Sequence, residues 1–105
     1  MNSILKEISD IGIVPVVTIA DAAVAVALAD ALAEGGIPCA EITFRTPAAR
    51  DSVAAVAKER PDMLLGAGTV LTVEQADAAI DAGADFIVTP GLNPEVVRHC
   101  QERDI

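Results

Sequence analysis

Short apolar segments and longer helix-forming segments alternate four times along the 105 residues of this chain. The apolar segments are rich in β-branched residues, as strands are, and they start near Ile13, Cys39, Met63 and Asp85. These starts lie 26, 24 and 22 residues apart, which is the repeat length of a βα unit rather than of a helical solenoid. The spacing therefore predicts four parallel strands, each followed by a helix.

The segments that flank the first strand are also predictable. Apolar residues at helical spacing predict a short amphipathic helix over residues 3–10, which ends before Gly12 and covers one end of the sheet. The apolar run over residues 13–19 is expected to form a strand buried on both faces. Asp21 is then placed to cap an Ala-rich helix that ends at Glu34.

Polar residues with helix-capping preferences predict where the later helices begin. Proline follows Thr46 and Asn93 at the first helical position. Gln75 lies three residues after Thr72, as in a capping box. The helices are expected over residues 48–60, through residue 81, and from residue 94 to the C-terminus. The predicted caps are Thr46, Thr72 and Asn93.

The composition indicates one domain over residues 1–105 and excludes several classes of function. Only 2% of the residues are aromatic, so the core must consist of Ala, Val, Ile and Leu, the usual filling of helix-covered parallel sheets. The net charge of −9 repels nucleic acid and anionic lipid, and neither is expected as a partner. No apolar run approaches the roughly 18 residues of a membrane-spanning helix, and charged residues near the N-terminus do not fit a signal peptide.

The cysteines and the histidine predict a cytoplasmic protein without a metal or other cofactor. Cys39 and Cys100 follow no disulfide pattern, which suits a reducing compartment. His99 and Cys100 are adjacent in a predicted helix and point about 100° apart, so they cannot converge on one metal ion.

A polar alternation in the second apolar segment marks the candidate site. Glu41, Thr43 and Arg45 are expected on one side of a strand, because side chains alternate faces with a period of two. An acid and a guanidinium on one surface indicate an anionic ligand. The alternative is a structural ion pair between Glu41 and Arg45 within the core.

The carboxyl ends of parallel strands are where chemistry is expected in such a sheet. Arg45, Thr69, Thr89 and Pro90 fall at these ends. The segment GAGTVLT, residues 66–72, brings two glycines there, which allow close approach by a ligand or simply tight packing between strands. The glycines alone favour the packing interpretation.

The sequence resembles the 2-keto-3-deoxy-6-phosphogluconate (KDPG) / 4-hydroxy-2-oxoglutarate (KHG) aldolase family. Four segments carry the resemblance, and together they span almost the whole chain: IVPVV (13–17), GGIPCAEITFRTP (35–47), GAGTVLT (66–72) and AGADFIVTPGL (82–92). The resemblance implies an α/β fold of the (β/α) barrel, or TIM-barrel, family. Only the first four βα units are present, a half-barrel preceded by a short N-terminal helix.

The family's activity implies roles for four residues. Family members are class I aldolases, in which a lysine forms an imine with the substrate ketone and pyruvate and an aldehyde are released. By the resemblance, Glu41 matches the general acid/base, and Arg45 and Thr69 match residues that hold the keto-acid carboxylate. Pro90 matches a wall of the active site.

The imine-forming lysine and the phosphate-binding loops lie on later strands of the family's barrel. This chain has only Lys6 and Lys58, both expected to be solvated surface residues, so it is expected to be inactive alone. A half-barrel also leaves an open face and two strand edges, which favours a truncated enzyme, a homo-oligomer or a complementing half-barrel. Two rival functions remain: a different phosphosugar-binding barrel enzyme that uses Glu41 as a base, and a non-enzymatic half-barrel that self-assembles.

Overall fold

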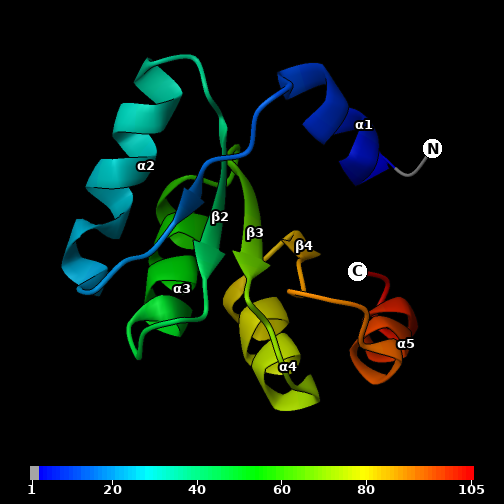
Figure 1. The fold of residues 1–105 in the computed structure, drawn as a ribbon. Coiled ribbons are helices and arrows are strands. Elements are labelled where there is room, and N and C mark those ends of the chain that lie inside the picture. The colour runs from blue at the N-terminus through cyan, green and yellow to red at the C-terminus, as the bar shows by residue number, and fades with distance from the viewer. Residues whose placement is uncertain (1–2) are drawn as a thin grey trace.

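The computed structural model describes residues 3–105 and shows strands alternating with helices (Figure 1). The four strands form one parallel sheet in the order β1-β2-β3-β4, as the spacing predicts. In chain order the elements are α1 (Ser3–Ile11), β1 (Val16–Val17), the 3₁₀-helix η1 (Ala22–Val24), α2 (Ala25–Glu34), β2 (Cys39–Thr43), α3 (Ala49–Glu59), β3 (Leu64–Gly68), α4 (Val73–Ala82), β4 (Phe86–Ile87) and α5 (Pro94–Glu102).

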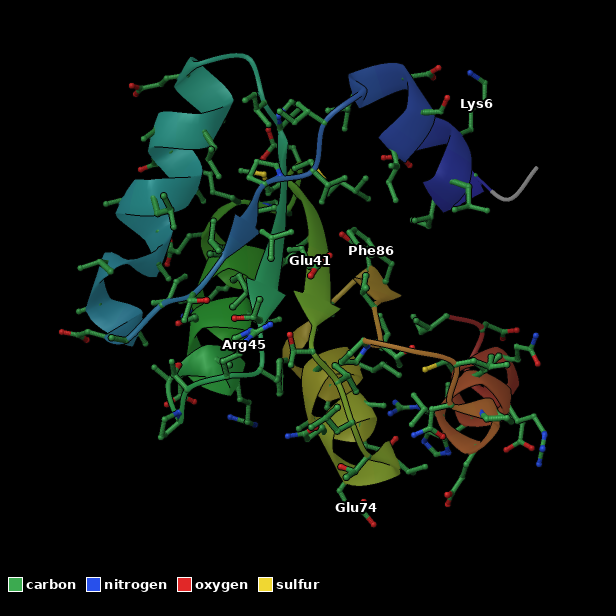
Figure 2. The ribbon with its side chains drawn as sticks, viewed as in Figure 1. Lys6, Glu41, Arg45, Glu74 and Phe86 are labelled. Carbon is green, nitrogen blue, oxygen red and sulfur yellow. The ribbon has the colours of Figure 1, made fainter. Side chains whose placement is uncertain are left out.

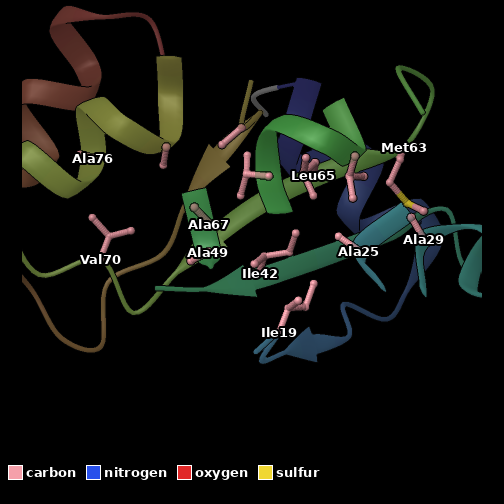
Figure 3. Packing of buried hydrophobic residues seen from close by; sticks show 14 of the residues in the cluster. Ile19, Ala25, Ala29, Ile42, Ala49, Met63, Leu65, Ala67, Val70 and Ala76 are labelled. Atoms are coloured by element: carbon pink, nitrogen blue, oxygen red, sulfur yellow. The ribbon is translucent and has the colours of Figure 1, made fainter. Parts of the chain in front are cut away.

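Helices cover one face of the sheet, and the hydrophobic core lies beneath them. Helices α2 and α3 contact β2, α3 also contacts β3, and α4 contacts β4. Ile42, Leu65 and Ala67 point from the strands into this layer, where small and aliphatic side chains of the helices meet them (Figure 3). The expected core of Ala, Val, Ile and Leu is confirmed.

The first strand differs from its prediction. Residues 13–19 were expected to be buried on both faces, but β1 has only two residues, and Ile13 and Val16 are 54% and 64% exposed. A parallel strand is buried on both faces only where a second layer covers it. Within the described residues, helices cover one face, so side chains of β1 that point the other way meet solvent.

Three of the four predicted caps form, although Asp21 caps the 3₁₀-helix η1 that leads into α2, and α2 itself begins after Val24 without a side-chain cap. Asp21 Oδ1 accepts from the backbone N–H of Ala23 at 3.0 Å, Thr72 Oγ1 from that of Gln75 at 3.1 Å, and Asn93 Oδ1 from that of Val96 at 3.3 Å. Thr46 was predicted as a cap and is not one.

The Thr46 hydroxyl donates instead to the carbonyl of Ile19 at 2.6 Å. Helix α3 therefore begins at Ala49, after Ala48, and no side-chain hydrogen bond caps it. A long-range hydrogen bond to the loop after β1 competes here with the local capping preference, and local sequence cannot reveal such a partner.

Helix α1 lies beside the amino ends of the strands (Figure 1). A small cleft of about 190 Å³ separates Ile4 and Glu7 of α1 from the start of β3 at Leu64. The helix lies at one end of the sheet, as predicted, but it has no buried residue. Within residues 3–105, no helix has the length and apolarity that crossing a membrane requires.

Candidate functional site

The candidate site occupies the face of the sheet that the helices leave open. Ile42 points into the core, so its neighbours Glu41 and Thr43 point to the opposite face. In the register of the sheet, Glu41 lies opposite Val16 on one side and Gly66 on the other, and Gly66 lies opposite Phe86. Figure 2 shows Glu41 and Phe86 close to each other on this open face.

Glu41 has a largely buried side chain whose carboxyl group has no partner within the described part of the chain. It is 9% exposed, and no hydrogen bond or ion pair joins its side chain to any of residues 3–105. Burial raises the pKa of Glu41 above its usual value of 4.5, because the charged form loses hydration there. The carboxyl therefore keeps its proton to a higher pH than an exposed glutamate does.

Arg45 does not lie in the strand with Glu41, although the alternation predicts that it does. Strand β2 ends at Thr43, and Arg45 is exposed in the turn that follows. The structural ion pair between Glu41 and Arg45, which the sequence left open, does not form. Figure 2 places Arg45 at the carboxyl end of β2, and its guanidinium has no ion-pair partner within the described part of the chain.

Thr43 takes a structural role beside Glu41. Its side chain is 1% exposed, and its hydroxyl forms a hydrogen bond with that of Thr18 at 3.0 Å. This bond joins the loop after β1 to β2. Thr43 is thus satisfied within the protein, whereas Glu41 and Arg45 retain free hydrogen-bonding capacity.

Thr69 has a backbone conformation that a β-branched residue seldom adopts. Its φ angle is +55°, in the left-handed region, and it follows directly after the last residue of β3. Such conformations cost about 1–3 kcal/mol and cluster at functional sites. The strain is an independent reason to keep Thr69 among the candidate residues, and the sequence contains no sign of it.

Backbone hydrogen bonds hold the three loops of the candidate site side by side. The N–H of Phe44 donates to the carbonyl of Gly68 at 2.7 Å, and that of Val70 donates to the carbonyl of Val88 at 3.2 Å. The segments that carry Arg45, Thr69 and Pro90 therefore emerge from one edge of the sheet. Pro90 is exposed, and beside it the Thr89 hydroxyl donates to the carbonyl of Gly91 at 2.6 Å.

Phe86 is the residue of this face that the sequence analysis missed. A Cβ atom on Gly66 would overlap the Phe86 ring, so the ring lies directly over that glycine. Side chains alternate faces along the fourth apolar segment, but this alternation alone does not decide whether Phe86 lies on the helix-covered face of the sheet or on the open face. Only the register between β3 and β4 assigns the ring to the side of Glu41.

The other features of the surface do not extend the candidate site. Among residues 3–105, no group of three or more His, Cys, Asp or Glu side chains could hold a metal ion. A cleft of about 330 Å³ lies beside β4, between α1 and α5; Phe86 and Thr89 line it, whereas Glu41, Arg45 and Thr69 do not.

Comparison with known proteins gives one consistent family. The family model for KDPG and KHG aldolases matches residues 2–105. A 2-dehydro-3-deoxy-phosphogluconate aldolase of Treponema pallidum is 53% identical over 100 residues, and one of Haemophilus influenzae is 48% identical over 101 residues. These matches cover 95% and 96% of this chain and 48% of each relative, so the chain spans about half the length of the curated relatives it matches.

The similarity extends to solved structures. The KDPG aldolase of Legionella pneumophila, solved with pyruvate captured as a covalent carbinolamine intermediate, is similar with a TM-score of 0.83 at 39% sequence identity. The similarity covers 88% of this chain and 45% of that protein. The four-stranded sheet thus corresponds to about half of a TIM barrel. The chain belongs to the KDPG and KHG aldolase family.

Proposed function

We propose that this chain forms the acid/base half of a class I aldolase site. The reaction is the retro-aldol cleavage of 2-keto-3-deoxy-6-phosphogluconate or 4-hydroxy-2-oxoglutarate to pyruvate and an aldehyde. In this chemistry a lysine amine condenses with the C2 ketone to give an imine, which accepts the electron pair released when the C3–C4 bond breaks. Protonation of the resulting enamine at C3 and hydrolysis of the imine then release pyruvate and restore the amine.

Glu41 is the proposed general acid/base. The observation that carries this proposal is a buried carboxyl with a raised pKa and no partner, on the open face of a sheet whose relatives are aldolases. Its carboxylate would accept the proton of the C4 hydroxyl as the bond breaks. The resulting carboxylic acid would return a proton to the enamine carbon.

Three residues at the carboxyl edge of the sheet are the proposed substrate-binding groups. The exposed guanidinium of Arg45 has the charge and the planar donor geometry that a keto-acid carboxylate requires. The Thr69 hydroxyl lies on the adjacent loop and would donate a second hydrogen bond. Pro90, on the loop after β4, would form an apolar wall.

The imine-forming lysine is proposed to lie outside residues 1–105. Lys6 lies on α1, where its ammonium pairs with Asp10 at 2.8 Å, and Figure 2 shows it at the far end of the molecule from Arg45. Lys58 lies in the last turn of α3 and is exposed. Both ammonium groups are exposed to solvent, an environment that does not activate an amine for nucleophilic attack.

The rest of the barrel is proposed to come from a further segment of a longer enzyme, from a second copy or from a complementing half-barrel, with residues 1–105 as a single domain. Val16, on the face of Glu41, is 64% exposed, and β1 and β4 are both edge strands. Exposed strand edges of this kind favour association. Free thiols at Cys39 and Cys100 are consistent with a proposed cytoplasmic location.

A chimera tests the proposed activity. It joins this chain to the second half of the Treponema pallidum relative, and pyruvate release from 2-keto-3-deoxy-6-phosphogluconate is measured. We expect turnover, and we expect Glu41→Gln to lower kcat by roughly 10²- to 10⁴-fold, the usual contribution of a positioned acid/base. Glu59→Gln, an exposed acid at the end of α3, is the matched control and should retain activity.

Borohydride trapping tests where the nucleophile lies. The chain alone is incubated with pyruvate and borohydride, which reduces an imine to a stable secondary amine, and its intact mass is measured. We expect no adduct on the folded chain and an adduct on the chimera. An adduct on Lys6 or Lys58, or a folded chimera in which Glu41→Gln is fully active, would contradict the proposal.

A further inference from the structure

Two glycines of β3 each lie beneath a side chain from a neighbouring strand. A Cβ atom on Gly66 would overlap the ring of Phe86, and one on Gly68 would overlap the carboxyl group of Glu41, at 2.6 Å from its Cδ. Gly66 and Gly68 both belong to β3, and a side chain at either position would lie on the open face of the sheet. We call Gly66, Gly68 and Phe86 the carboxyl seat.

The register of the sheet explains why Glu41 lies over Gly68. Its Cα partner is Gly66, but the Phe86 ring already occupies the space above Gly66. The Glu41 side chain therefore leans toward the carboxyl end of the sheet, over Gly68, whose own Cα partner is Thr43. Any side chain larger than hydrogen at position 68 would fill the space that the carboxyl now occupies.

We propose that Gly68 is a positioning residue for Glu41, because the missing side chain at position 68 leaves the space that keeps the carboxyl against the sheet. The inference rests on the proposed acid/base function of Glu41 for its catalytic consequence. Gly68 itself touches no substrate, since the carboxyl of Glu41 covers it. Between the two interpretations of GAGTVLT, this structure supports packing at Gly66 and Gly68.

The seat also accounts for the protonation behaviour of Glu41. The Phe86 ring covers Gly66, the carboxyl lies over the backbone of Gly68, and no residue of 3–105 donates a hydrogen bond to the carboxylate. Burial without a donor favours the neutral acid, which is the cause of the raised pKa of Glu41. Displacing the carboxyl into solvent would remove that cause.

Nuclear magnetic resonance of the whole 105-residue chain tests the proposal. Glutamate labelled with ¹³C at Cδ reports the titration midpoint of Glu41 in the native chain and in Gly68→Ala. We expect the native midpoint above 4.5 and the Gly68→Ala midpoint shifted down toward that usual value. Gly91→Ala is the matched control, because a Cβ atom there meets nothing within 4 Å, and it should leave the midpoint unchanged.

A double-mutant cycle covers the case in which Gly68→Ala does not fold. Glu41→Ala empties the space above Gly68, so Gly68→Ala should destabilise the Glu41→Ala background far less than the native chain, as measured by urea unfolding. The proposal is overturned if a folded Gly68→Ala titrates at the native midpoint. It is also overturned if the double variant fails to fold while Glu41→Ala folds.

The two proposals fail separately. If the chimera has no aldolase activity but Gly68→Ala still lowers the titration midpoint of Glu41, the positioning role of Gly68 is supported and the proposed function is contradicted. If Glu41→Gln abolishes turnover but Gly68→Ala leaves the midpoint and the pH profile of kcat unchanged, the function stands and Gly68 is not a positioning residue.

Discussion

At the scale of single residues, the buried polar side chains separate structural roles from functional ones. Thr43, Glu41 and Ser52 are the buried polar or charged residues within residues 3–105. Thr43 is satisfied by Thr18, and Glu41 carries the proposed chemistry. Ser52, in the middle of α3, is fully buried, and its hydroxyl oxygen has no hydrogen-bond partner in the described part of the chain.

Replacing Ser52 by alanine should stabilise the protein. An unsatisfied buried hydroxyl costs roughly 1–3 kcal/mol, and alanine also has the higher helix propensity. We expect Ser52→Ala to raise the free energy of unfolding by about 1 kcal/mol in urea denaturation. Ser3→Ala, the same change at an exposed position of α1, is the control. A destabilised Ser52→Ala would mean that the hydroxyl has a partner that the structure does not show.

At the scale of elements, the helix starts depend on specific side-chain hydrogen bonds. Thr72 caps α4 through the N–H of Gln75, and the Gln75 side chain accepts from the N–H of Leu71 at 2.8 Å. These two bonds satisfy donors that the start of a helix otherwise leaves unpaired. Helix α3 begins without such a side-chain cap, because Thr46 bonds to the loop after β1.

Thr72→Ala tests the cap of α4. Loss of the hydroxyl leaves the Gln75 N–H unpaired, and we expect the free energy of unfolding to fall by about 1 kcal/mol. Thr72→Ser keeps the oxygen and should restore most of the stability. Equal losses in the alanine and serine variants would show that the methyl group of Thr72, rather than its hydroxyl, is responsible.

A cluster of charged side chains joins α4 to α5. Asp77 accepts from His99 at 2.6 Å and from Arg103 at 2.8 Å, and Arg103 also donates to Asp81 at 2.9 Å. The hydrogen bond with His99, followed by that from Arg103, lowers the pKa of Asp77 below its usual value of 3.8. The charged form of Asp77 is thus favoured in the folded state.

Stability should depend on pH through Asp77. An acid with a lowered folded pKa stabilises the protein above its unfolded pKa, and that stabilisation disappears as pH falls through the folded pKa. We expect Asp77→Asn to lower the urea midpoint at neutral pH and to match the native chain at a pH well below 3.8. Glu102→Gln, an acid-to-amide change at an exposed position of α5, should not reproduce this pattern. A deficit in Asp77→Asn that is constant with pH would contradict the ion-pair explanation.

At the scale of the whole molecule, one layer of helices on one sheet leaves the opposite face without a cover. The molecule measures 36 × 32 × 21 Å, and the exposed Val16 lies on the same face as Glu41. In a complete TIM barrel, side chains from the other strands fill the interior that this face lines. Strands beyond these four would cover this face, as they do in a complete TIM barrel.

Self-association should depend on salt as well as on concentration. Copies with a net charge of −9 repel one another, and salt screens that repulsion. We expect sedimentation velocity to show larger species as protein or salt concentration rises. Val16→Asp should weaken the association, whereas Val24→Asp, at a 53% exposed position on the helical side, should not. A monomer at every concentration and salt level would rule out association through this face.

The sequence by itself determined the order of the elements, most helix caps, the composition of the core and the family. These features depend on local spacing and on side-chain preferences that act within a few residues, as at Asp21, Thr72 and Asn93. The tertiary structure alone decided that Thr46 bonds to Ile19, that Val16 is exposed and that Thr69 adopts a positive φ angle. It also decided that Phe86 covers Gly66 and that Glu41 lies over Gly68. The physical reason is that strand register and the layers over a sheet bring together residues that are distant in the chain, and local patterns leave those contacts undetermined.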